Sequence, residues 1–541
     1  MVSASTSLIL RCAMALIAGM CSAHSSLALA SDLIFEDGFE VALGSAFFVS
    51  PQGLDTNPGT KVLPFQTINK GIATAATDPV KKTVVVAGGT YSESISLVDG
   101  VSLFGQYQTG TWTRDPANDT VINGAAAVNN HLRTVTASNI ASATTLDGFV
   151  IYGAVNATAG GNSYAIYISA SSANLRISNN VIYGGRGGPG AAGPPGTNGS
   201  AGVDGAAYSS VLDSFTAAGA GQCSVSNNRT ASGGGTLTCG TPVNGGNGGG
   251  NNCTPAQSTQ NSTATSPASA GTTGGGTGDG SGGTAGTRGY DAALNGSTCF
   301  LPISGGQVQS MSGGDGSDGG SGASAVPGAS GCVVPAGNVA VDDWMTDTAA
   351  SGSVGANGGG GGGGGAGGGA ACTTNATCKD MLGGHGGGGG SGACGGSGGN
   401  GGSGGGGAFD IFVVGGTAPI IRRNTLFLGD GGDGGNGGDG GVGGLGGDGS
   451  QGGQTGALFC TGQGGRGGNG GTGGHGSGGG GGCGGASVGI YTSGAGTPDY
   501  CTAGNNIGYG GFAGSGGAGG ASLVSPGGAG QTGIQAVCSF N

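Results

Sequence analysis

The sequence is poor in the residues from which ordinary globular enzymes are built. Only 8% of its 541 residues are charged and 5% are aromatic. Beyond the N-terminal segment, no stretch has the roughly 18 consecutive apolar residues that a membrane-spanning helix needs. These shortages argue against a conventional enzyme over most of the chain and against a transmembrane protein. The formal net charge is −12, which would repel a phosphate backbone, so we expect no nucleic-acid partner.

Glycine takes the place of the missing residues, and its distribution is uneven. The chain has 142 glycines, of which 16 lie in residues 1–183 and the other 126 in residues 184–541. The second part has too few large apolar side chains to bury a conventional core. Two kinds of material are therefore joined in one chain.

The N-terminal 30 residues have the layout of a secretory signal peptide. Arg11 precedes an apolar stretch, and an A-x-A cleavage site ends at Ala30. A lipoprotein signal ending at Cys21 is an alternative, but Met20 is bulkier than the residue expected before a lipidated cysteine. We predict cleavage after Ala30 and a secreted or cell-surface protein.

Cysteine usage agrees with export. Of the 14 cysteines, two fall in the signal peptide, and an even number in the exported remainder suggests disulfides. No C-x-x-C occurs, so a zinc site is the weaker interpretation, and we expect no metal and no cofactor. Sequence does not fix connectivity, but close pairs would be Cys223 with Cys239, Cys372 with Cys378, and Cys460 with Cys483. The disulfide candidates are Cys223, Cys239, Cys253, Cys299, Cys332, Cys372, Cys378, Cys394, Cys460, Cys483, Cys501 and Cys538.

Residues 47–183 have the pattern of short β-strands separated by turns. Runs of β-branched and aromatic residues alternate with Gly, Asn and Asp. One helix is predicted at about 64–76, with Pro64 at its first position and Ile68 and Ile72 at helical spacing. Many short strands and little helix indicate an all-β repeat, either a sandwich or a solenoid. The predicted strands are Phe47–Val49, Thr83–Val86, Val101–Phe104, Thr120–Ile122, Gly148–Tyr152 and Tyr164–Ile168.

Motifs in this region resemble the pectate-lyase-like right-handed parallel β-helix proteins, many of which are described only as a domain of unknown function. The run 48–60, followed by 64–68, is similar to the opening of that family. Residues 86–91 resemble its next signature, a strand and a P-G-T-Y-like turn, although Ala87-Gly88 replaces the usual proline-containing form. The resemblance covers about a quarter of the chain. It implies a single-stranded parallel β-helix and does not imply an activity.

A similar strand pattern recurs inside the glycine-rich part. Residues 409–427 and 486–511 each parallel residues 164–183, and a glycine-rich stretch follows each copy. We therefore interpret these stretches as excursions from one corner of a continuing solenoid; isolated strands in a disordered tail are the alternative. Paired asparagines in the repeats suit a tight corner, where the amide can hydrogen-bond to the next turn. The predicted organisation is a signal peptide 1–30, a linker 31–46, a β-helix 47–183, excursions 184–407 and 429–485, rungs 408–428 and 486–512, and a glycine-rich C-terminal tail 513–541.

The excursions have a three-residue period. From Asp430 to Gln454 every third residue is variable, and Ser450 is the only other residue that is not glycine. A polyproline-II-type helix has three residues per turn, so it would align the variable side chains and let its glycine edges pair with neighbouring helices. Ordered glycine is entropically costly, so such a bundle would need disulfides as staples, and a flexible linker is the alternative. Six Gly-X-Y triplets at 187–204 are too few for collagen.

The arrays resemble, in composition only, the glycine-rich PGRS surface proteins and the polyglycine bundles of the snow-flea antifreeze proteins. Lyases of the β-helix family would imply clustered acids for calcium and an arginine base, but the candidate groups here are scattered and fit turns or solvated faces. One copy of a calcium-binding nonapeptide pattern begins at Gly313. The residues considered are Asp99, Asp115, Asp119, Asp147, Arg133, Arg176, Arg422, Arg423, His131, His385, His475 and the pair Asp342-Asp343.

The sequence favours an exported structural or adhesive surface protein without catalytic activity, and it leaves enzyme activity undecided. Cell-surface glycans or envelope components are the expected partners. One alternative is a calcium-dependent polysaccharide lyase-like enzyme or glycan-binding module. Another is an ice-binding protein, because polyglycine bundles and solenoids offer flat, regular faces. Substrate and oligomeric state lie beyond the sequence.

Overall fold

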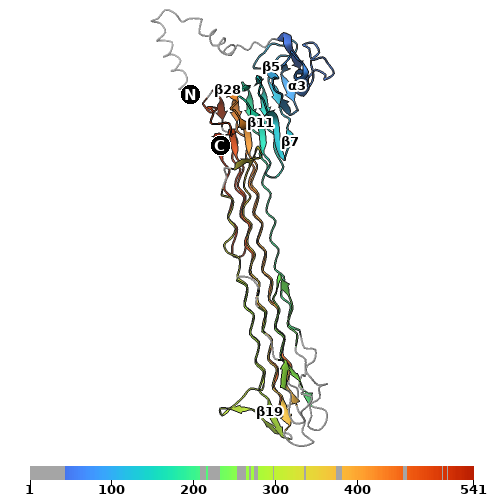
Figure 1. Cartoon of the computed structure of the whole chain (residues 1–541), viewed down its shortest axis with the longest axis vertical. Coiled ribbons are helices and arrows are strands. Elements are labelled where there is room, and N and C mark those ends of the chain that lie inside the picture. The colour runs from blue at the N-terminus through green and yellow to red at the C-terminus, as the bar shows by residue number, and fades with distance from the viewer. Residues whose placement is uncertain are drawn as a thin grey trace, which may run out of the picture.

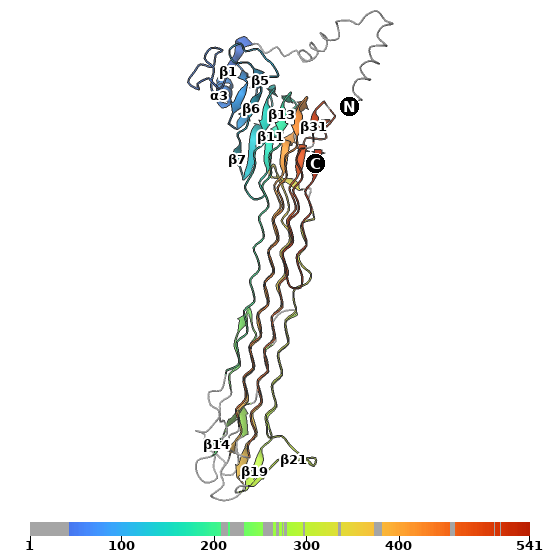
Figure 2. The same cartoon turned by 180° about the vertical axis from the view of Figure 1, so that it is seen from behind.

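A strand-rich body and a long, narrow stalk make up the molecule (Figure 1). The computed structural model describes residues 43–206, 215–216, 232–252, 263–266, 270–272, 274, 278–295, 298–333, 337–372, 381–454, 460–502, 504–508 and 510–540. The predicted signal peptide lies outside these residues. The glycine-rich segments form the stalk, and the last described strand returns to the body (Figures 1 and 2).

The body consists of three sheets, here called A, B and C, and each coil from β2 to β30 adds one strand to each sheet in turn. The expected all-β fold with parallel sheets is confirmed. Sheet A contains β1 (Ala46–Val49), β2 (Thr83–Ala87), β5 (Ser102–Tyr107), β9 (Thr144–Asp147), β12 (Leu175–Ser178) and β28 (Ile420–Arg422). Sheet B contains β3 (Gly89–Tyr91), β6 (Thr120–Ile122), β10 (Val150–Tyr152), β13 (Val181–Tyr183), β29 (Thr425–Phe427) and β31 (Asn506–Gly508). Sheet C contains β4 (Ile95–Leu97), β8 (His131–Ser138), β11 (Ser163–Ser171), β27 (Ala408–Gly416), β30 (Ser487–Ser493) and β32 (Gln535–Phe540), with β7 (Ala126–Val128) antiparallel to β8.

Apolar residues at equivalent positions of successive coils form the core. On sheet B, Ile122 lies beside Ile151, which lies beside Ile182, and Leu426 continues the column. All four side chains are fully buried. Each strand therefore needs only one or two inward-pointing β-branched or Leu residues, which explains why strands of three residues are sufficient.

The helix α3 (Ile68–Thr77) covers the first strands of sheets A and C. The sequence predicted a start at Pro64, and this was wrong because Thr67 is the N-cap: its side chain accepts the N–H of Lys70. The carboxylate of Glu93 accepts the amides of Ile68 at 2.7 Å and Asn69 at 3.0 Å. These bonds satisfy N–H groups that have no partner within the helix.

An asparagine ladder fixes the corner between sheets A and B. The side chain of Asn180 donates to Asn424 Oδ1 at 3.1 Å, and Asn424 in turn donates to Asn505 Oδ1 at 3.1 Å. The residue before each of them has a left-handed backbone: Asn179 at φ 54°, Arg423 at φ 58° and Gly504 at φ 80°. The corner asparagine was therefore predicted correctly. What recurs is one asparagine preceded by a residue with a left-handed backbone, rather than a pair of asparagines.

All three glycine-rich excursions leave the same corner, between sheet B and sheet C. They connect β13 to β27, β29 to β30, and β31 to β32. The strands on either side remain neighbours: Tyr164 of β11 pairs in parallel with Phe409 of β27, although they are 245 positions apart in the sequence. The prediction that residues 513–541 form a tail was wrong, because β32 pairs with β30 and closes a further coil of sheet C.

Candidate functional site

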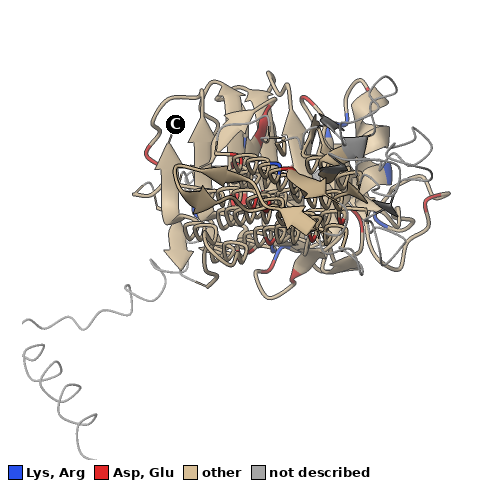
Figure 3. Ribbon diagram, turned by 90° about the horizontal axis from the view of Figure 1, so that it is seen from below, with Lys and Arg blue, Asp and Glu red and all other residues tan. Residues whose placement is uncertain are grey.

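The stalk is held together by backbone hydrogen bonds that repeat every third residue. Eight bonds of 2.8–2.9 Å join residues 464–485 to the antiparallel residues 432–453 of the same excursion. Seven bonds of 2.7–2.8 Å join residues 187–205 to the parallel residues 430–448 of another excursion. Residues 514–520 donate in the same way to 485–479. The three excursions therefore form one bundle, which appears in end view as rows of coils packed together (Figure 3).

The number of glycines in each triplet rises with the number of bundle segments that surround it. Residues 187–205 read Gly-X-Y, and both non-glycine positions are mostly exposed. Residues 430–448 read X-Gly-Gly, with one exposed position per triplet. Residues 478–485 are glycine except for Cys483, and all are buried. A Cβ on Gly478, Gly481 or Gly484 would lie 2.1, 2.0 or 1.8 Å from a carbonyl oxygen of the third excursion.

Side chains at the variable positions link parallel neighbours in register. Asp430, Asp433, Asn436 and Asp439 each accept, through a side-chain oxygen, the backbone N–H of the residue 82 positions later, at 2.7–3.0 Å. The pKa of Asp433 is lowered, chiefly by the hydrogen bonds from the side chain and amide of Ser515. A short polar side chain in the second excursion thus accepts a backbone N–H of the third excursion. A glycine at the same position would offer that N–H no side-chain acceptor. Sequence reasoning identified the positions but not this role.

A second set of these bonds spans 151 residues. Asp315 accepts the amide of Arg466 and Asp318 accepts that of Asn469, both at 2.7 Å. Ser324 accepts the amide of His475 at 3.1 Å. These residues come from the first and second excursions, so the polar side chains fix how two separate excursions align. Asp315 and Asp318 belong to the calcium-type pattern that begins at Gly313, and here their side chains accept backbone N–H groups.

Four disulfides cross-link the described part of the chain, and this fits an extracellular protein. They join Cys239 to Cys394, Cys299 to Cys460, Cys332 to Cys483, and Cys501 to Cys538. The suggested pairs Cys223–Cys239 and Cys460–Cys483 were wrong, because bonding follows adjacency in the bundle rather than in the sequence. Cys223, Cys253 and Cys378 lie outside the described residues. The suggested pair Cys372–Cys378 therefore stays a prediction.

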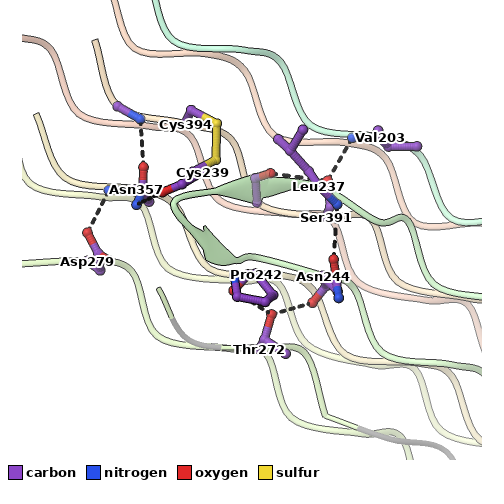
Figure 4. The surroundings of a disulfide bond; sticks show 12 residues. Val203, Leu237, Cys239, Pro242, Asn244, Thr272, Asp279, Asn357, Ser391 and Cys394 are labelled. Carbon is purple, nitrogen blue, oxygen red and sulfur yellow. Dashed lines mark hydrogen bonds between the residues drawn. A yellow bond between two sulfur atoms is a disulfide. The ribbon is translucent and has the colours of Figure 1, made fainter. Parts of the chain in front are cut away.

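The Cys239–Cys394 bond anchors a short hairpin to the stalk (Figure 4). The hairpin consists of β15 (Thr238–Cys239) and β16 (Thr241–Pro242). Beside it, the side-chain oxygen Oδ1 of Asn357 accepts the backbone N–H of Gly395 at 3.0 Å. The backbone N–H of Asn357 donates to Asp279 Oδ1 at 2.7 Å. One asparagine therefore bridges two further segments at the point where the disulfide closes.

A second hairpin, β23 (Asn338–Ala340) with β24 (Asp343–Met345), returns from the stalk and docks on the outer face of sheet C. Trp344 is 1% exposed and packs edge-on against Phe409, with 5.5 Å between ring centroids. Its amide donates to Tyr164 Oη at 3.1 Å, and its carbonyl oxygen accepts Asn162 Nδ2 at 2.6 Å. The base of the stalk is thereby packed against the body.

The docked hairpin brings together three residues that were considered as catalytic candidates. Arg133 donates to Asp343 Oδ1 at 2.8 Å and lies 3.5 Å from the ring centroid of Tyr167. His131 Nε2 is 4.0 Å from Asp343 Oδ2, and its Nδ1 accepts the amide of Asn162 at 2.9 Å. Burial lowers the pKa of His131, an effect that Asp343 opposes and Arg133 reinforces. The three side chains are only 9–14% exposed, so this cluster is not an open reaction site. It holds the hairpin β23–β24 against sheet C.

The other candidate groups also have structural roles. Asp99 accepts the amides of Ala141 and Ser142, and Asp115 accepts that of Ala117, as expected for turn residues. Asp147 differs, because it is buried in β9 and pairs with Arg114.

Asp147 also accepts hydrogen bonds from Ser178 and Asn179, both at 2.6 Å. Arg176 and Arg422 lie on β12 and β28 of the same sheet A, with Arg423 directly after β28. Among the residues that the structure describes, no three His, Cys, Asp or Glu side chains are grouped to hold a metal ion. No helix in that part of the chain is long and apolar enough to cross a bilayer.

Asp410 is a buried carboxyl at the point where the stalk meets the body. It lies near the start of β27, is fully buried, and has no hydrogen-bond partner of normal geometry among the described residues. A Cβ on Gly184 would lie 2.3 Å from Asp410 Oδ1, which places the carboxyl beside the start of the first excursion. Burial raises the pKa of Asp410 well above its usual range, although the nearby amide of Gly429 opposes the shift.

Comparison with known proteins gives one partial family match and no activity. A family model described as a protein of unknown function (DUF1565) matches residues 51–235. No curated protein matches the chain. Among solved structures, one similar chain is a rhamnogalacturonan lyase, with 18% sequence identity and a TM-score of 0.18. The match covers 27% of this chain and 40% of the lyase, so this chain spans less than half of that protein.

Proposed function

We propose that the chain is an exported, non-catalytic surface protein in which a right-handed parallel β-helix supports a polyglycine-II-type stalk. The observation that carries this proposal is that three excursions leave one corner of the body and join into a single bundle. Residues 430–453 alone would extend about 70 Å at the rise of a three-residue helix. Such a shape suits a spacer that holds its far end away from the body.

Two features support a role outside the cell. Disulfides connect separate excursions, and such bonds persist in oxidising compartments. The stalk side chains are mostly small or neutral, and the few carboxylates are used in register-setting hydrogen bonds. These features favour display and adhesion, with cell-surface glycans or envelope components as the partners.

The polar clusters of the body give the lyase alternative little support. Arg133 and Asp343 are paired beneath a docked hairpin, and Asp147 is paired with Arg114. Neither arrangement leaves an exposed arginine beside a group of carboxylates, which a calcium-assisted elimination would need. Polyuronates incubated with the purified protein should therefore yield no unsaturated product absorbing in the ultraviolet.

The direct test is association of the purified, oxidised mature protein with cells. The protein should co-sediment with cells or isolated envelopes, and a reduced and alkylated sample should co-sediment less, because the stalk loses its cross-links. If the oxidised protein stays in the supernatant with every cell and envelope preparation, the adhesive role is wrong. Small-angle scattering on the same sample supplies a control for the elongated shape.

A further inference from the structure

The far end of the stalk carries an exposed apolar patch. Here β19 (Ala292–Asn295) and β20 (Thr298–Phe300) are followed by the hairpin β21 (Ile303–Ser304) and β22 (Gln307–Val308). The hairpin projects sideways at the end opposite the body (Figures 1 and 2). The exposed fractions are 54% for Tyr290, 54% for Phe300, 46% for Leu301, 69% for Ile303 and 61% for Val308.

This patch is uncharged, whereas the chain as a whole is acidic. Residues 292–314 contain no Asp, Glu, Lys or Arg, and the formal net charge of the chain is −12. The stalk separates the patch from the charges of the body by several times the Debye length, which is about 8 Å at physiological ionic strength. Two copies approaching tip to tip therefore meet little like-charge repulsion.

The backbone at the tip is also open to a partner. The distal sheet has the order β14 (Phe215–Thr216), β26 (Met381–Leu382), β25 (Ala370–Cys372), β19 and β20. Its last strand, β20, pairs with β19 and with no other strand in the described part of the chain. Such an edge presents N–H and C=O groups that another strand can pair with.

The tip is held firmly enough to act as a docking surface. Cys299 in β20 is bonded to Cys460, and it packs against a small core that includes Leu294 and Met381. The sides of the stalk, in contrast, carry exposed apolar residues such as Leu445 beside carboxylates. Their glycine edges are already occupied by neighbouring segments, and Asp433, Asp439 and Asp448 lie along one side.

We propose that the tip is a self-association site, at which a second copy of this chain docks through the β20 edge and the apolar side chains around it. The inference rests on the stalk role proposed above and adds the contact surface and the partner. A two-fold arrangement lets each copy present the same patch, with two β20 edges antiparallel. The patch is small, so each contact is weak, and many copies on facing surfaces supply avidity.

Sedimentation equilibrium of the oxidised mature protein tests this proposal. The wild-type chain should dimerise reversibly, and Ile303→Asp or Phe300→Asp should raise the dissociation constant at least about tenfold, since a charge would be buried at the contact. The matched control is Leu445→Asp, because Leu445 is 73% exposed on the side of the stalk and the change of side chain is the same. It should leave the constant unchanged, and scattering should show a dimer about twice as long as the monomer.

Three results would overturn the proposal. The first is a monomer at every concentration, and the second is a dimer that Ile303→Asp leaves intact. The third is a monomer that instead binds phosphatidylcholine vesicles through the tip, which would make lipid the partner. Failure here is distinguishable from failure of the proposed function: a protein that co-sediments with cells lacking this chain but stays monomeric in sedimentation equilibrium refutes the tip contact and not adhesion. Unchanged melting temperatures of the variants exclude misfolding as the cause.

Discussion

Cys332 and Cys483 are joined across 151 residues, and Asp315 is hydrogen-bonded to Arg466 across the same separation. The disulfide therefore continues a hydrogen-bonded ladder between the first and second excursions, with a covalent bond in place of a carboxylate–amide contact. Closing a loop of this length contributes roughly 5 kcal/mol in the chain-entropy description. The two kinds of link fix the same register, one near the body and the other along the stalk.

Replacing both of these cysteines by serine should loosen the stalk more than the body. We expect a loss of about 2–5 kcal/mol and faster amide exchange in residues 478–485, because these residues are buried among segments that the disulfide holds together. Hydrogen exchange with mass spectrometry measures this. Cys501→Ser with Cys538→Ser is the control, since that bond ties β32 to the loop between β30 and β31 and should change exchange in the body only.

Glycine at the enclosed positions of the stalk should be irreplaceable even by alanine. A Cβ on Gly481 would lie 2.0 Å from Gly517 O, so Gly481→Ala should destabilise the protein by roughly 1–3 kcal/mol and expose the third excursion to exchange. Gln463→Ala, at an exposed variable position of the same excursion, should change stability by less than about 0.5 kcal/mol. Equal effects in thermal unfolding would contradict the relation between glycine content and enclosure.

Local patterns in the sequence were sufficient to predict several strands and one corner of the body, although the strand His131–Ser138 was not among the predicted ones. The strand Thr120–Ile122 has its predicted bounds, and the corner asparagine Asn180 forms the expected bond to the next coil. Short β-branched runs and turn residues act over a few positions, and their effect can be read directly from the chain. The bounds of α3 were less accurate because the Thr67 cap overrides the preference of Pro64 for a first helical turn.

The arrangement of the stalk could not be derived in the same way. A three-residue period shows that segments can pair, but many near-identical glycine segments give no indication of which ones are neighbours. The partner of Cys460 is Cys299, 161 residues away, because the two lie together at the distal end. Trp344 was not recognised as a docking residue for a related reason: its partners Tyr164 and Phe409 lie far away in the sequence.

The side chain of Asp433 should stabilise the third excursion in a pH-dependent way. Its pKa is lowered in the fold, so its contribution is present above the ordinary aspartate range and is lost as the pH falls through the lowered value. Asp433→Ala should raise exchange at the amide of Ser515 at neutral pH. Asp433→Asn keeps an acceptor, as Asn436 does for Ala518, and should remove the dependence on acid. Exchange that is equal in the alanine and asparagine variants would refute this role.

The buried carboxyl of Asp410 should have the opposite pH signature. Because its pKa is raised in the fold, the protonated form is favoured, and stability is greatest below the ordinary aspartate pKa and falls as the pH rises through the raised value. Asp410→Asn, which is neutral and of similar size, should raise the melting temperature at pH 8 and leave it nearly unchanged at pH 4. Thermal unfolding of both proteins across that range measures the difference. Asp99→Asn is the control, since Asp99 is exposed and hydrogen bonds from Ser142 lower its pKa, so this variant should be no more stable than wild type at pH 8. A gain at pH 4 equal to that at pH 8 would show that the benefit comes from packing rather than from removing a charge.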